Sequence, residues 1–525
     1  AEVLEVPDTG CFSRLTGSLL KIIIILSFIR VLNKEMTSLP NMLGRYVNNL
    51  NKRTHRFSNF SRTYKICVVG SGPGAFYTAQ ELLKRSGAEI DIFERLPVPF
   101  GLVRYGVAPD HPEVKNCING FTSLMQTRRC RFYGNVNVGK DISVEQLRSA
   151  YNGVVLAYGA ENNRKLGIPG EDISGCYAAR EFVGWYNGIP SMAGLKPDLS
   201  CENVVIFGHG NVALDVARML LSPVAVLEKT DISGAALETL INSKIRNVYI
   251  IGRRGPLQTA FTIKEFRELT KLPNCHGHLD KNVFTDLNSI IPDLARPRRR
   301  LTELMMKTAL SEKTAELCQQ TGSQHWHMKF NRSPTEVLSS PNCRRVSGIR
   351  MEINKLEKTS EAVRAVGSGK FENLACGLVI SSIGYKSIAI DENVPFDAVT
   401  GIIPNVKGRV ISKSSLTKQD QFVKGLYCSG WVKRGPIGVI ASTMKDAFET
   451  AEMISEDMKQ DNLPTSSCFG FEEIAKYLDQ KGVRYVTFED WNKIDAHEKY
   501  LGRMKNKPRE KLTSVVEMLN VIDTP

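Results

Sequence analysis

The sequence contains twelve cysteines but no C-x-x-C pair. This spacing excludes the common zinc motifs and the dithiol motif of thiol–disulfide enzymes, and it predicts no metal site. It does not indicate a disulfide framework either, so the thiols are typical of a protein in a reducing compartment. We expect most of them, including Cys67, to be small core residues.

A hydrophobic run long enough to cross a membrane is also missing. The strongest candidate, residues 22–29, is eight residues long and lies between Lys21 and Arg30. A membrane-spanning helix needs about 20 residues. The run has the length of a signal-peptide core, but no clear small-residue cleavage site follows it.

Acidic residues are absent from Met36–Lys65, which carries arginines and lysines among Ser, Thr and Asn. That composition is typical of a mitochondrial transit peptide, and the alternative is a disordered basic tail without an address. We expect residues 1–64 to be a leader that is disordered or removed. Because the chain begins with Ala1, we expect translation to start at Met36 or Met42, with the preceding residues extraneous.

The rest of the composition is that of a globular protein with a large core. The chain has 525 residues, 42% of them hydrophobic and 24% charged, which is enough for two or three domains. The net charge is +14. A basic protein favours an acidic partner, nucleic acid or an anionic membrane surface, and the charge does not choose among them.

The stretch Lys65–Ala79 (KICVVGSGPGAFYTA) organises the chain. Its first residues form a short apolar run that predicts a buried parallel strand. Gly70 and Gly72 then allow a tight turn and a close approach of a pyrophosphate, and a helical pattern follows. Gly74 and Ala75 occupy the small positions that let this helix pack closely on the strand.

A carboxylate follows the next predicted strand. Glu94 comes directly after Glu89–Phe93, near the offset of about 20 residues at which a ribose-binding acid is expected. We expect this site to refuse a 2′-phosphate and to bind FAD. The alternative is an ordinary Gly-rich surface turn.

A second fingerprint lies in Asn203–Asp215 (NVVIFGHGNVALD), where Gly208, Gly210 and Ala213 follow an apolar strand. The next strand ends in Arg253 and Arg254 instead of an acid. Two guanidinium groups at this position favour a 2′-phosphate, so we expect NADPH here. The alternative is a solvated basic turn.

Two fingerprints predict an α/β fold with two Rossmann-like dinucleotide-binding domains, the NADP domain being inserted into the FAD domain. We expect the first segment of the FAD-binding domain at 65–161 and the NADP-binding domain at 162–388. The second segment of the FAD-binding domain, with the C-terminal tail, is expected at 389–525. The apolar strands in Val154–Ala160 and Gly377–Gly384 precede the two crossings, at which the chain passes from the FAD-binding domain to the NADP-binding domain and back. We expect Leu96–Val114 to be an irregular loop, Lys355–Lys370 a hairpin or loop, and Lys413–Gln421 a polar insertion.

The stretch Gly425–Ile440 predicts a strand at Leu426–Cys428, a Gly-Pro turn and a helix from about Val439 to Met458. The N-terminus of that helix is expected to face the flavin ring and to favour its reduced, anionic form. Trp431 is expected beside the ring, or else packed at the surface. We expect residues 465–525 to be a polar tail segment that is helical in part, and we assign no chemistry to it.

The densest basic cluster is Arg296–Leu301 (RPRRRL). It is either the solvated start of a helix or a docking patch for an acidic partner. Nucleic acid is a third interpretation, but no aromatic residues alternate with the charges as single-strand binding requires.

These stretches together closely resemble the mitochondrial ferredoxin reductases of the adrenodoxin reductase type, from about Lys65 to Leu519. The motifs that carry the resemblance are GSGPGAFYTAQ (70–80), VPFGLVRYGVAPDHPEVKN (98–116), FVGWYNG (182–188), GNVALDVAR (210–218), GRRGPLQ (252–258), SSIGYKS (381–387), GLYCSGWVKRGP (425–436) and KPREKL (507–512). The resemblance implies a mitochondrial matrix flavoenzyme. It would take a hydride from NADPH and pass single electrons to an acidic [2Fe-2S] ferredoxin, which serves cytochromes P450 and iron–sulfur cluster assembly. It also implies a monomeric protein that does not bind nucleic acid, and it is compatible with peripheral association with the inner membrane.

The resemblance also implies the site residues. FAD would contact Gly74, Glu94, Leu102, Val138, Trp431, Gly438, Val439 and Ile440. NADPH would contact His209, Gly210, Asn211, Val212, Arg253, Arg254, Glu265 and Gly438. The ferredoxin would face Arg296, Arg298, Arg299 and Arg300. The sequence departs from the family at Gly74-Ala75, where Ala-Gly is usual, at His209, where Gln is common, and at the Lys413–Gln421 insertion.

A flavin bridges a two-electron donor and a one-electron acceptor, so neither half-reaction needs a nucleophile or metal ligand from this chain. We single out His111 and Asp215 as candidate catalytic residues in a proton relay, the alternative being hydrogen-bonded scaffold residues. Other functions stay open. They are an NADPH–disulfide reductase, which the missing C-x-x-C disfavours, an NADPH oxidase or quinone reductase, and a non-enzymatic nucleotide-binding protein.

Overall fold

The computed structural model describes residues 63–311, 323–340, 343–359, 362–413, 420–465 and 468–523. The start-codon prediction, nearly all of the leader 1–64 and the centre of the Lys413–Gln421 insertion lie outside these ranges. Of the leader, Tyr64 is buried, and its hydroxyl donates to Asp461 Oδ1 at 2.9 Å.

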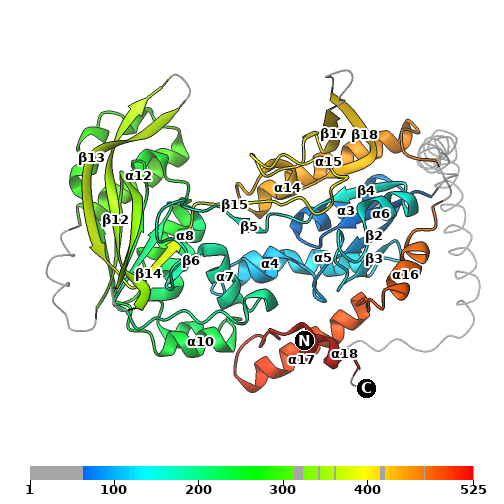
Figure 1. Cartoon of the computed structure of the whole chain (residues 1–525), viewed down its shortest axis with the longest axis horizontal. Helices are drawn as coiled ribbons and strands as arrows, with labels where there is room; N and C mark the ends of the chain where they lie inside the picture. Colours follow the sequence, from blue (N-terminus) through cyan, green and yellow to red (C-terminus); the bar gives the residue numbers. More distant parts are fainter. Residues whose placement is uncertain are drawn as a thin grey trace, which may run out of the picture. The chain divides into compact units, whose positions relative to one another are not determined.

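The first layer is a seven-stranded sheet in the order β16-β17-β18-β4-β1-β2-β3 (Figure 1). Strands β18, β4, β1, β2 and β3 run parallel, and the β16–β17 hairpin is antiparallel at the edge. The central strands are apolar and buried on both faces, as parallel strands covered by helices require. The bounds are β1 Lys65–Val69, β2 Glu89–Phe93, β3 Cys130–Tyr133, β4 Gly153–Leu156, β16 Asn405–Val406, β17 Arg409–Lys413 and β18 Asp420–Cys428.

Helices pack on this sheet from separate regions of the sequence. Helix α3 (Pro73–Arg85) packs against α15 (Ile440–Lys459), so the helix predicted from about Val439 to Met458 is confirmed. Their apolar faces fill one core cluster with Phe76, Ala79 and Ile454. Smaller helices complete the cover, namely α5 (Cys117–Met125), α6 (Val144–Ala150) and α14 (Trp431–Arg434). We call this sheet with its helices the seven-stranded half.

The second layer is a six-stranded, fully parallel sheet in the order β6-β14-β7-β8-β10-β9. Its strands are β6 Cys176–Ala178, β7 Asn203–Phe207, β8 Asn247–Ile251, β9 Cys275–Leu279, β10 Gln324–Lys329 and β14 Leu378–Ser381. Its helices include α7 Ala179–Asn187, α8 Asn211–Leu221, α9 Val224–Leu227, α10 Gly234–Ile241, α11 Ile263–Leu269 and α12 Arg296–Ala309. We call these elements the six-stranded half.

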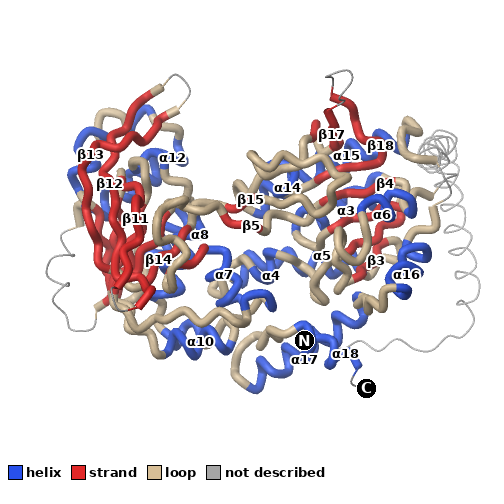
Figure 2. The backbone as a smooth tube through the Cα atoms, viewed as in Figure 1, coloured by secondary structure: helices blue, strands red, loops and turns tan. Residues whose placement is uncertain are grey.

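A three-stranded antiparallel sheet extends the six-stranded half. It consists of β11 (Arg332–Ser340), β12 (Cys343–Lys358) and β13 (Val363–Ala375), the long strands marked in Figure 2. Val337 and Ile349 pack with Val205 of β7 in a separate buried cluster. The stretch expected as a hairpin or loop at Lys355–Lys370 is the tip of the β12–β13 hairpin.

The chain leaves the seven-stranded sheet after β4 and rejoins it at β16. The two crossings pair with each other as a short antiparallel ribbon, β5 (Asn162–Asn163) with β15 (Tyr385–Lys386). The predicted fold class, an α/β protein with one Rossmann-like domain inserted into another, is therefore confirmed. The exact domain boundaries stay predictions.

One stretch contains more structure than the sequence predicted, whereas the C-terminal tail contains the helices expected for part of it. Leu96–Val114 holds a one-turn helix, α4 (Leu102–Tyr105), and a 3₁₀ turn starts at Pro112 (η1, Pro112–Asn116). The expectation of no helix was wrong because the glycines flank α4 and the proline occupies the first position of η1, where no amide hydrogen is needed. The tail folds into α16 Phe471–Gln480, α17 Phe488–Met504 and α18 Val515–Asp523.

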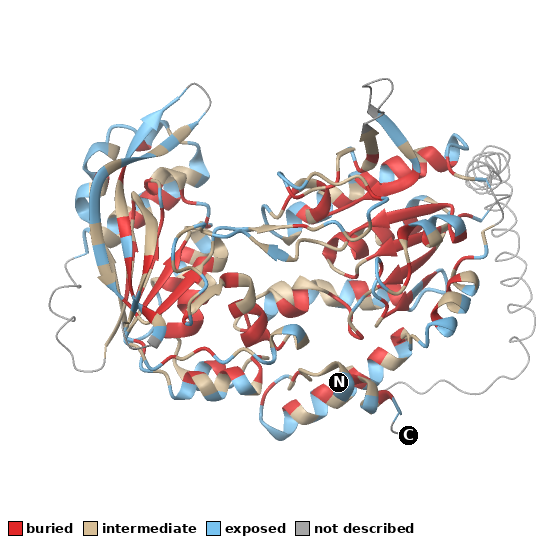
Figure 3. Cartoon of the chain, viewed as in Figure 1, coloured by how far each residue is buried: buried red, intermediate tan, exposed pale blue. Residues whose placement is uncertain are grey.

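Buried residues concentrate in the two large sheets and on the helix faces that cover them (Figure 3). No helix among the described residues is both long and apolar enough to cross a membrane.

Candidate functional site

A cavity of about 340 Å³ lies at the carboxyl ends of β1, β2 and β4 and extends to the first turns of α8. This is where ligands bind in open α/β sheets. The predicted site residues that line it are Gly70, Gly72, Gly74, Glu94, Leu102, His111, Asn211, Val212, Asp215, Glu265, Trp431, Gly438, Val439 and Ile440. The cavity thus brings residues of both fingerprints together.

The first fingerprint contains one position that requires glycine, Gly70, and one close backbone approach, at Gly74. Gly70 has a φ of +99°, and a Cβ there would lie 2.7 Å from the carbonyl oxygen of Ala157. A Cβ on Gly74 would lie 3.2 Å from Gly430 Cα. Ala75 does not line the cavity; it is fully buried in the core, where a small residue lets α3 approach the strands.

Glu94 is oriented by the turn that it closes. Its Oε2 accepts from the backbone N–H and the hydroxyl of Ser71 at 2.9 and 2.7 Å. Its Oε1 accepts from the backbone N–H of Leu96 at 3.1 Å. A carboxylate oxygen has more than one acceptor site, so the oriented group can still accept from a hydroxyl in the cavity.

The second fingerprint is built in the same way. Gly208 has a φ of +128°, and a Cβ would lie 2.1 Å from the carbonyl oxygen of Ser382. The ring of His209 packs edge-on against Phe330 at 5.0 Å and leaves no room for a Cβ at Gly252. Burial lowers the pKa of His209 to about 4, so its ring is neutral near pH 7. Gly208, His209 and Gly210 do not line the cavity itself.

Arg253 and Arg254 follow β8 directly. The carbonyl of Arg253 accepts from Asn354 Nδ2 at 2.9 Å, and that of Arg254 accepts from the N–H of Asn331 at 3.3 Å. The loop is therefore held by its backbone. Within the described ranges no ion pair involves either guanidinium, and Arg253 is exposed.

His111 and Asp215 belong to one charged cluster that joins the two halves. Arg218 donates to Asp110 at 2.5 and 3.0 Å and to Asp215 at 2.9 Å. Burial raises the pKa of Asp215, and the charge of Arg218 opposes that rise. His111 is 7% exposed, and its Nε2 lies 3.1 Å from Glu268 Oε2.

Trp431 stands at the first position of α14, with the ring of Tyr385 at 5.9 Å and 32° to it. Gly438, Val439 and Ile440 line the cavity where α15 begins. Val138 is the exception among the expected flavin contacts. It lies outside the cavity lining, 7% exposed in a core cluster with Ile142.

Several cavity residues had no role assigned from the sequence. They are Tyr105, Tyr158, Arg180, Tyr385 and Thr443. Tyr105 and Tyr385 belong to the motifs VPFGLVRYGVAPDHPEVKN and SSIGYKS, and these motifs could have indicated that both residues lie near the site. Their side-chain direction could not be deduced from the motifs.

The predicted docking arginines all lie on α12. Arg296 and Arg300 are exposed, and Arg299 lies 3.8 Å from Glu303. Arg298 instead donates to the carbonyl and hydroxyl oxygens of Thr259 at 2.8 and 3.0 Å. The basic cluster therefore starts a helix and also presents charge to solvent.

No group of three or more His, Cys, Asp or Glu side chains is arranged to hold a metal ion in the portion of the chain that the structure describes.

Comparison with known proteins identifies relatives of nearly the whole chain. Residues 64–268 match the model of the pyridine nucleotide-disulphide oxidoreductase family. The chain is 53% identical over 470 residues to the mitochondrial NADPH:adrenodoxin oxidoreductase of Homo sapiens, covering 89% of this chain and 94% of that protein. It is 47% identical to the protein of the same name from Arabidopsis thaliana, covering 87% and 95%. Its structure is similar to that of Mycobacterium tuberculosis FprA in complex with NADPH, with a TM-score of 0.80 and 36% identity over 88% of this chain and all of that one.

Proposed function

Because the chain belongs to the family of mitochondrial NADPH:adrenodoxin oxidoreductases, we propose that it transfers electrons from NADPH through FAD to a [2Fe-2S] ferredoxin of the adrenodoxin type. The observation that carries the proposal is that residues of the first fingerprint and the first turns of α8, in the second fingerprint, line one and the same cavity. A flavin and a nicotinamide must meet in one place for a hydride to pass.

The residues of the seven-stranded half fit FAD. No atom lies within 4 Å of the place where a Cβ of Gly72 would stand, so the turn leaves room for a pyrophosphate to reach the N-terminus of α3. Glu94, oriented by Ser71, would accept from a ribose hydroxyl. Leu102, Trp431 and the start of α15 would surround the ring, while Val138 would act through packing.

The residues of the six-stranded half fit NADPH. The N-terminus of α8 would receive the pyrophosphate, with Asn211 and Val212 at the cavity wall. Arg253 and Arg254 would bind the 2′-phosphate, because their side chains form no ion pair with another described residue and their loop is held by Asn331 and Asn354. Glu265 would line the nicotinamide side.

Bound FAD would supply the electron exchange in which NADPH and two oxidised ferredoxins give NADP⁺, a proton and two reduced ferredoxins. The chain's own residues exclude water and hold protons. Asp215 is positioned by Arg218, and His111 Nε2 faces Glu268, so these side chains can carry the released proton to solvent. Because Arg218 also binds Asp110, the same cluster holds the two halves together.

An acidic ferredoxin would dock on the exposed arginines of α12. The names of the relatives support a mitochondrial location, and the acid-free stretch Met36–Lys65 fits a transit peptide. We also propose placement in the matrix, a monomeric state, and domain limits at 65–161, 162–388 and 389–525. Peripheral association with the inner membrane is compatible with the net charge of +14.

A stopped-flow experiment with the purified yellow protein tests the function. NADPH should bleach the flavin much faster than NADH, and an acidic [2Fe-2S] ferredoxin should then be reduced rapidly. Bleaching without transfer to the ferredoxin would point to an oxidase or quinone reductase. If NADPH does not bleach the flavin at all, the protein binds nucleotides without this activity.

A further inference from the structure

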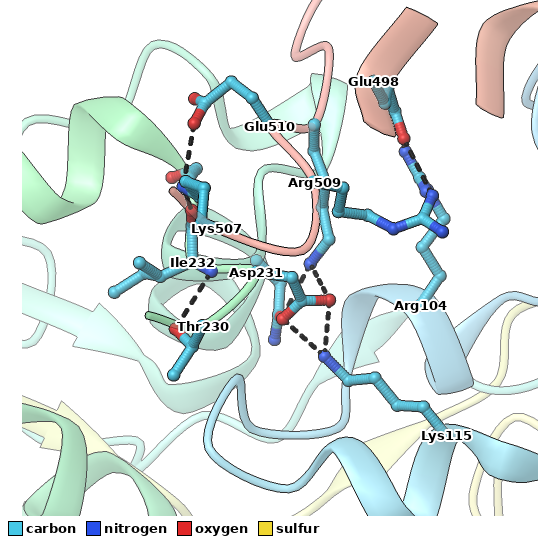
Figure 4. Close-up of polar contacts among 12 residues, drawn as sticks. Arg104, Lys115, Thr230, Asp231, Ile232, Glu498, Lys507, Arg509 and Glu510 are labelled. Atoms are coloured by element: carbon cyan, nitrogen blue, oxygen red, sulfur yellow. Dashed lines mark hydrogen bonds and ion pairs between the residues drawn. The ribbon is translucent and has the colours of Figure 1, made fainter. Parts of the chain in front are cut away.

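The segment Lys507–Leu512 lies between α17 and α18 and belongs to neither large sheet. No residue of this segment lines the cavity. The segment nevertheless contacts both halves of the molecule, and its Lys507 and Lys511 are buried; contacts around it are shown in Figure 4.

On the side of the seven-stranded half the contact is an ion pair between α4 and α17. Arg104 donates to Glu498 at 2.5 Å, and the two side chains are 4% and 0% exposed. The segment closes over this pair, because Arg509 lies 3.1 Å from the second oxygen of Glu498 and the N–H of Leu512 donates to the first at 2.9 Å. Removing one partner of such a buried ion pair strongly destabilises the folded protein, because the other charge stays buried without a partner.

On the side of the six-stranded half the segment holds the loop before α10. Lys507 Nζ donates to the carbonyl oxygen of Ile232 at 2.5 Å, and Glu510 accepts from the N–H of Gly234 at 3.0 Å. Lys511, whose side chain is fully buried, lies 3.2 Å from Asp231.

Asp231 also receives a lysine from the seven-stranded half. Lys115, at the end of η1, donates to both of its carboxylate oxygens at 2.7 Å. Lys115 and Lys511 thus share one carboxylate, and Lys511 has a second acceptor in Asn187 Oδ1 at 3.3 Å. The carboxylate of Asp231 is the point at which the tail, η1 and the six-stranded half meet.

The elements joined in this way are those that shape the cavity. Helix α4 carries Leu102 and Tyr105, and Val114 precedes Lys115. Asn187 ends α7, whose residues Val183 and Gly184 line the same cavity.

We propose that Lys507–Leu512 is an interdomain clasp, and that Lys511 and Asp231 are positioning residues that set the distance between the nicotinamide and flavin sites. The inference rests on the proposed function only in one respect, namely that a hydride passes between these two sites. No hydrogen bond or ion pair among the described residues joins the clasp to Arg253 or Arg254. We therefore expect the clasp to affect the rate of hydride transfer more than the affinity for NADPH.

The charge of the clasp adds to this role. Burial lowers the pKa of Lys511 to about 7, while Asp231 favours its charged form and Lys115 and Arg104 oppose it. Two ammonium groups facing one carboxylate hold one surplus positive charge. Loss of a proton from Lys511 therefore leaves the Lys115–Asp231 pair balanced, so the clasp changes charge within the physiological range.

The test compares the FAD-loaded wild type with Lys511→Met and Asp231→Asn. In stopped-flow reduction by NADPH we expect the limiting rate to fall roughly tenfold or more, with the apparent Kd for NADPH changed less than about threefold. Misplacement by about 1 Å is enough for such a loss. The wild type should show a step near pH 7 in the pH profile of this rate, and the step should be absent in Lys511→Met.

The matched control is Arg484→Met, which removes an exposed ion pair with Asp523 in the same C-terminal region. It should leave both constants unchanged. Hydrogen exchange of α4, η1 and α7 is followed in parallel and should be faster in the two clasp variants only. If Lys511→Met lowers thermal stability but leaves exchange in these elements and the rate per flavin as in the wild type, the clasp is wrong. If NADPH does not reduce the wild type, the proposed function fails, while the exchange measurement still decides on the clasp.

Discussion

At the scale of single residues, the specificity of the nucleotide site depends on a short loop after β8. Arg254 is half-buried and its carbonyl oxygen accepts from Asn331, so the position of its side chain is restricted by the backbone. We expect Arg254→Glu to weaken NADPH binding roughly 30-fold or more, because a charge-assisted phosphate contact is lost and repulsion replaces it. NADH, which lacks the 2′-phosphate, should be affected less than about threefold. Titration of flavin bleaching with both nucleotides measures this.

The exposed Arg267 on α11 supplies the control for net charge. Arg267→Glu changes the charge of the protein by the same amount but should leave both nucleotides unaffected. Equal losses for NADPH and NADH in Arg254→Glu would show that the residue does not recognise the 2′-phosphate.

At the scale of elements, α12 carries two kinds of arginine. Arg296 and Arg300 are exposed, whereas Arg298 ties the helix to Thr259, close in sequence to Arg254. We expect Arg296→Glu with Arg300→Glu to raise the KM for an acidic ferredoxin roughly tenfold at low salt and to flatten its salt dependence. Flavin reduction by NADPH should not change in this variant. Steady-state ferredoxin reduction at several ionic strengths is the measurement.

Arg298→Glu provides the comparison on the same helix. Because it leaves Thr259 without its donor, this variant should also change NADPH binding. Unaltered ferredoxin kinetics in the double variant would place the docking surface elsewhere.

The edge strand β9 and its neighbour β10 carry a grid of four of the chain's eight histidines, His276, His278, His325 and His327. The rings of His278 and His327 stack at 4.5 Å, and His278 Nε2 lies 3.0 Å from His325 Nδ1. Burial and the neighbouring imidazoles lower the pKa of His327 to about 3. In the folded protein His327 therefore resists protonation.

An unfolded His327 takes up a proton near pH 6.5, while the folded one does so only near pH 3. Above pH 6.5 the neutral His327 does not lower the free energy of unfolding. As the pH falls from 6.5 toward 3, the unfolded state binds the proton and the free energy of unfolding decreases, by at most about 1.4 kcal/mol per pH unit. We expect His327→Asn to flatten the acid limb of stability between pH 6 and 4, measured by urea unfolding. His497→Gln, on α17, should keep the wild-type slope; the same slope in His327→Asn would contradict the prediction.

The elements differ in how far the sequence alone predicts them. Both fingerprints predicted their strand, turn and helix, because glycine positions and apolar runs are local signals. Local signals also indicated that the tail is helical in part, but not its contacts, which depend on partners far away in sequence: Arg104 and Glu498 are 394 positions apart. The direction of a side chain, such as that of His209 into the core or of Arg298 toward Thr259, also depends on tertiary packing.

At the scale of the whole molecule, two of the ion pairs that join the halves start from one short stretch, residues 110–115, and we call these two pairs the ties. Asp110 binds Arg218 of α8, and five residues later Lys115 binds Asp231 beside Lys511. Interfaces between domains are usually polar and allow movement unless such ties restrict it. The two ties have no shared residue, so each can restrain the halves when the other is lost.

We therefore expect Asp110→Asn and Asp231→Asn, which each remove one carboxylate from its tie, to keep a single calorimetric unfolding transition of the FAD-loaded protein. The double variant should unfold in two resolved transitions, because each half has its own core and the coupling through both ties is lost. Each lost kcal/mol should lower a midpoint by about 2–4 °C in a half of this size. A single transition in the double variant, at the midpoint expected from adding the two single effects, would mean that the halves are held together by contacts other than these two ties.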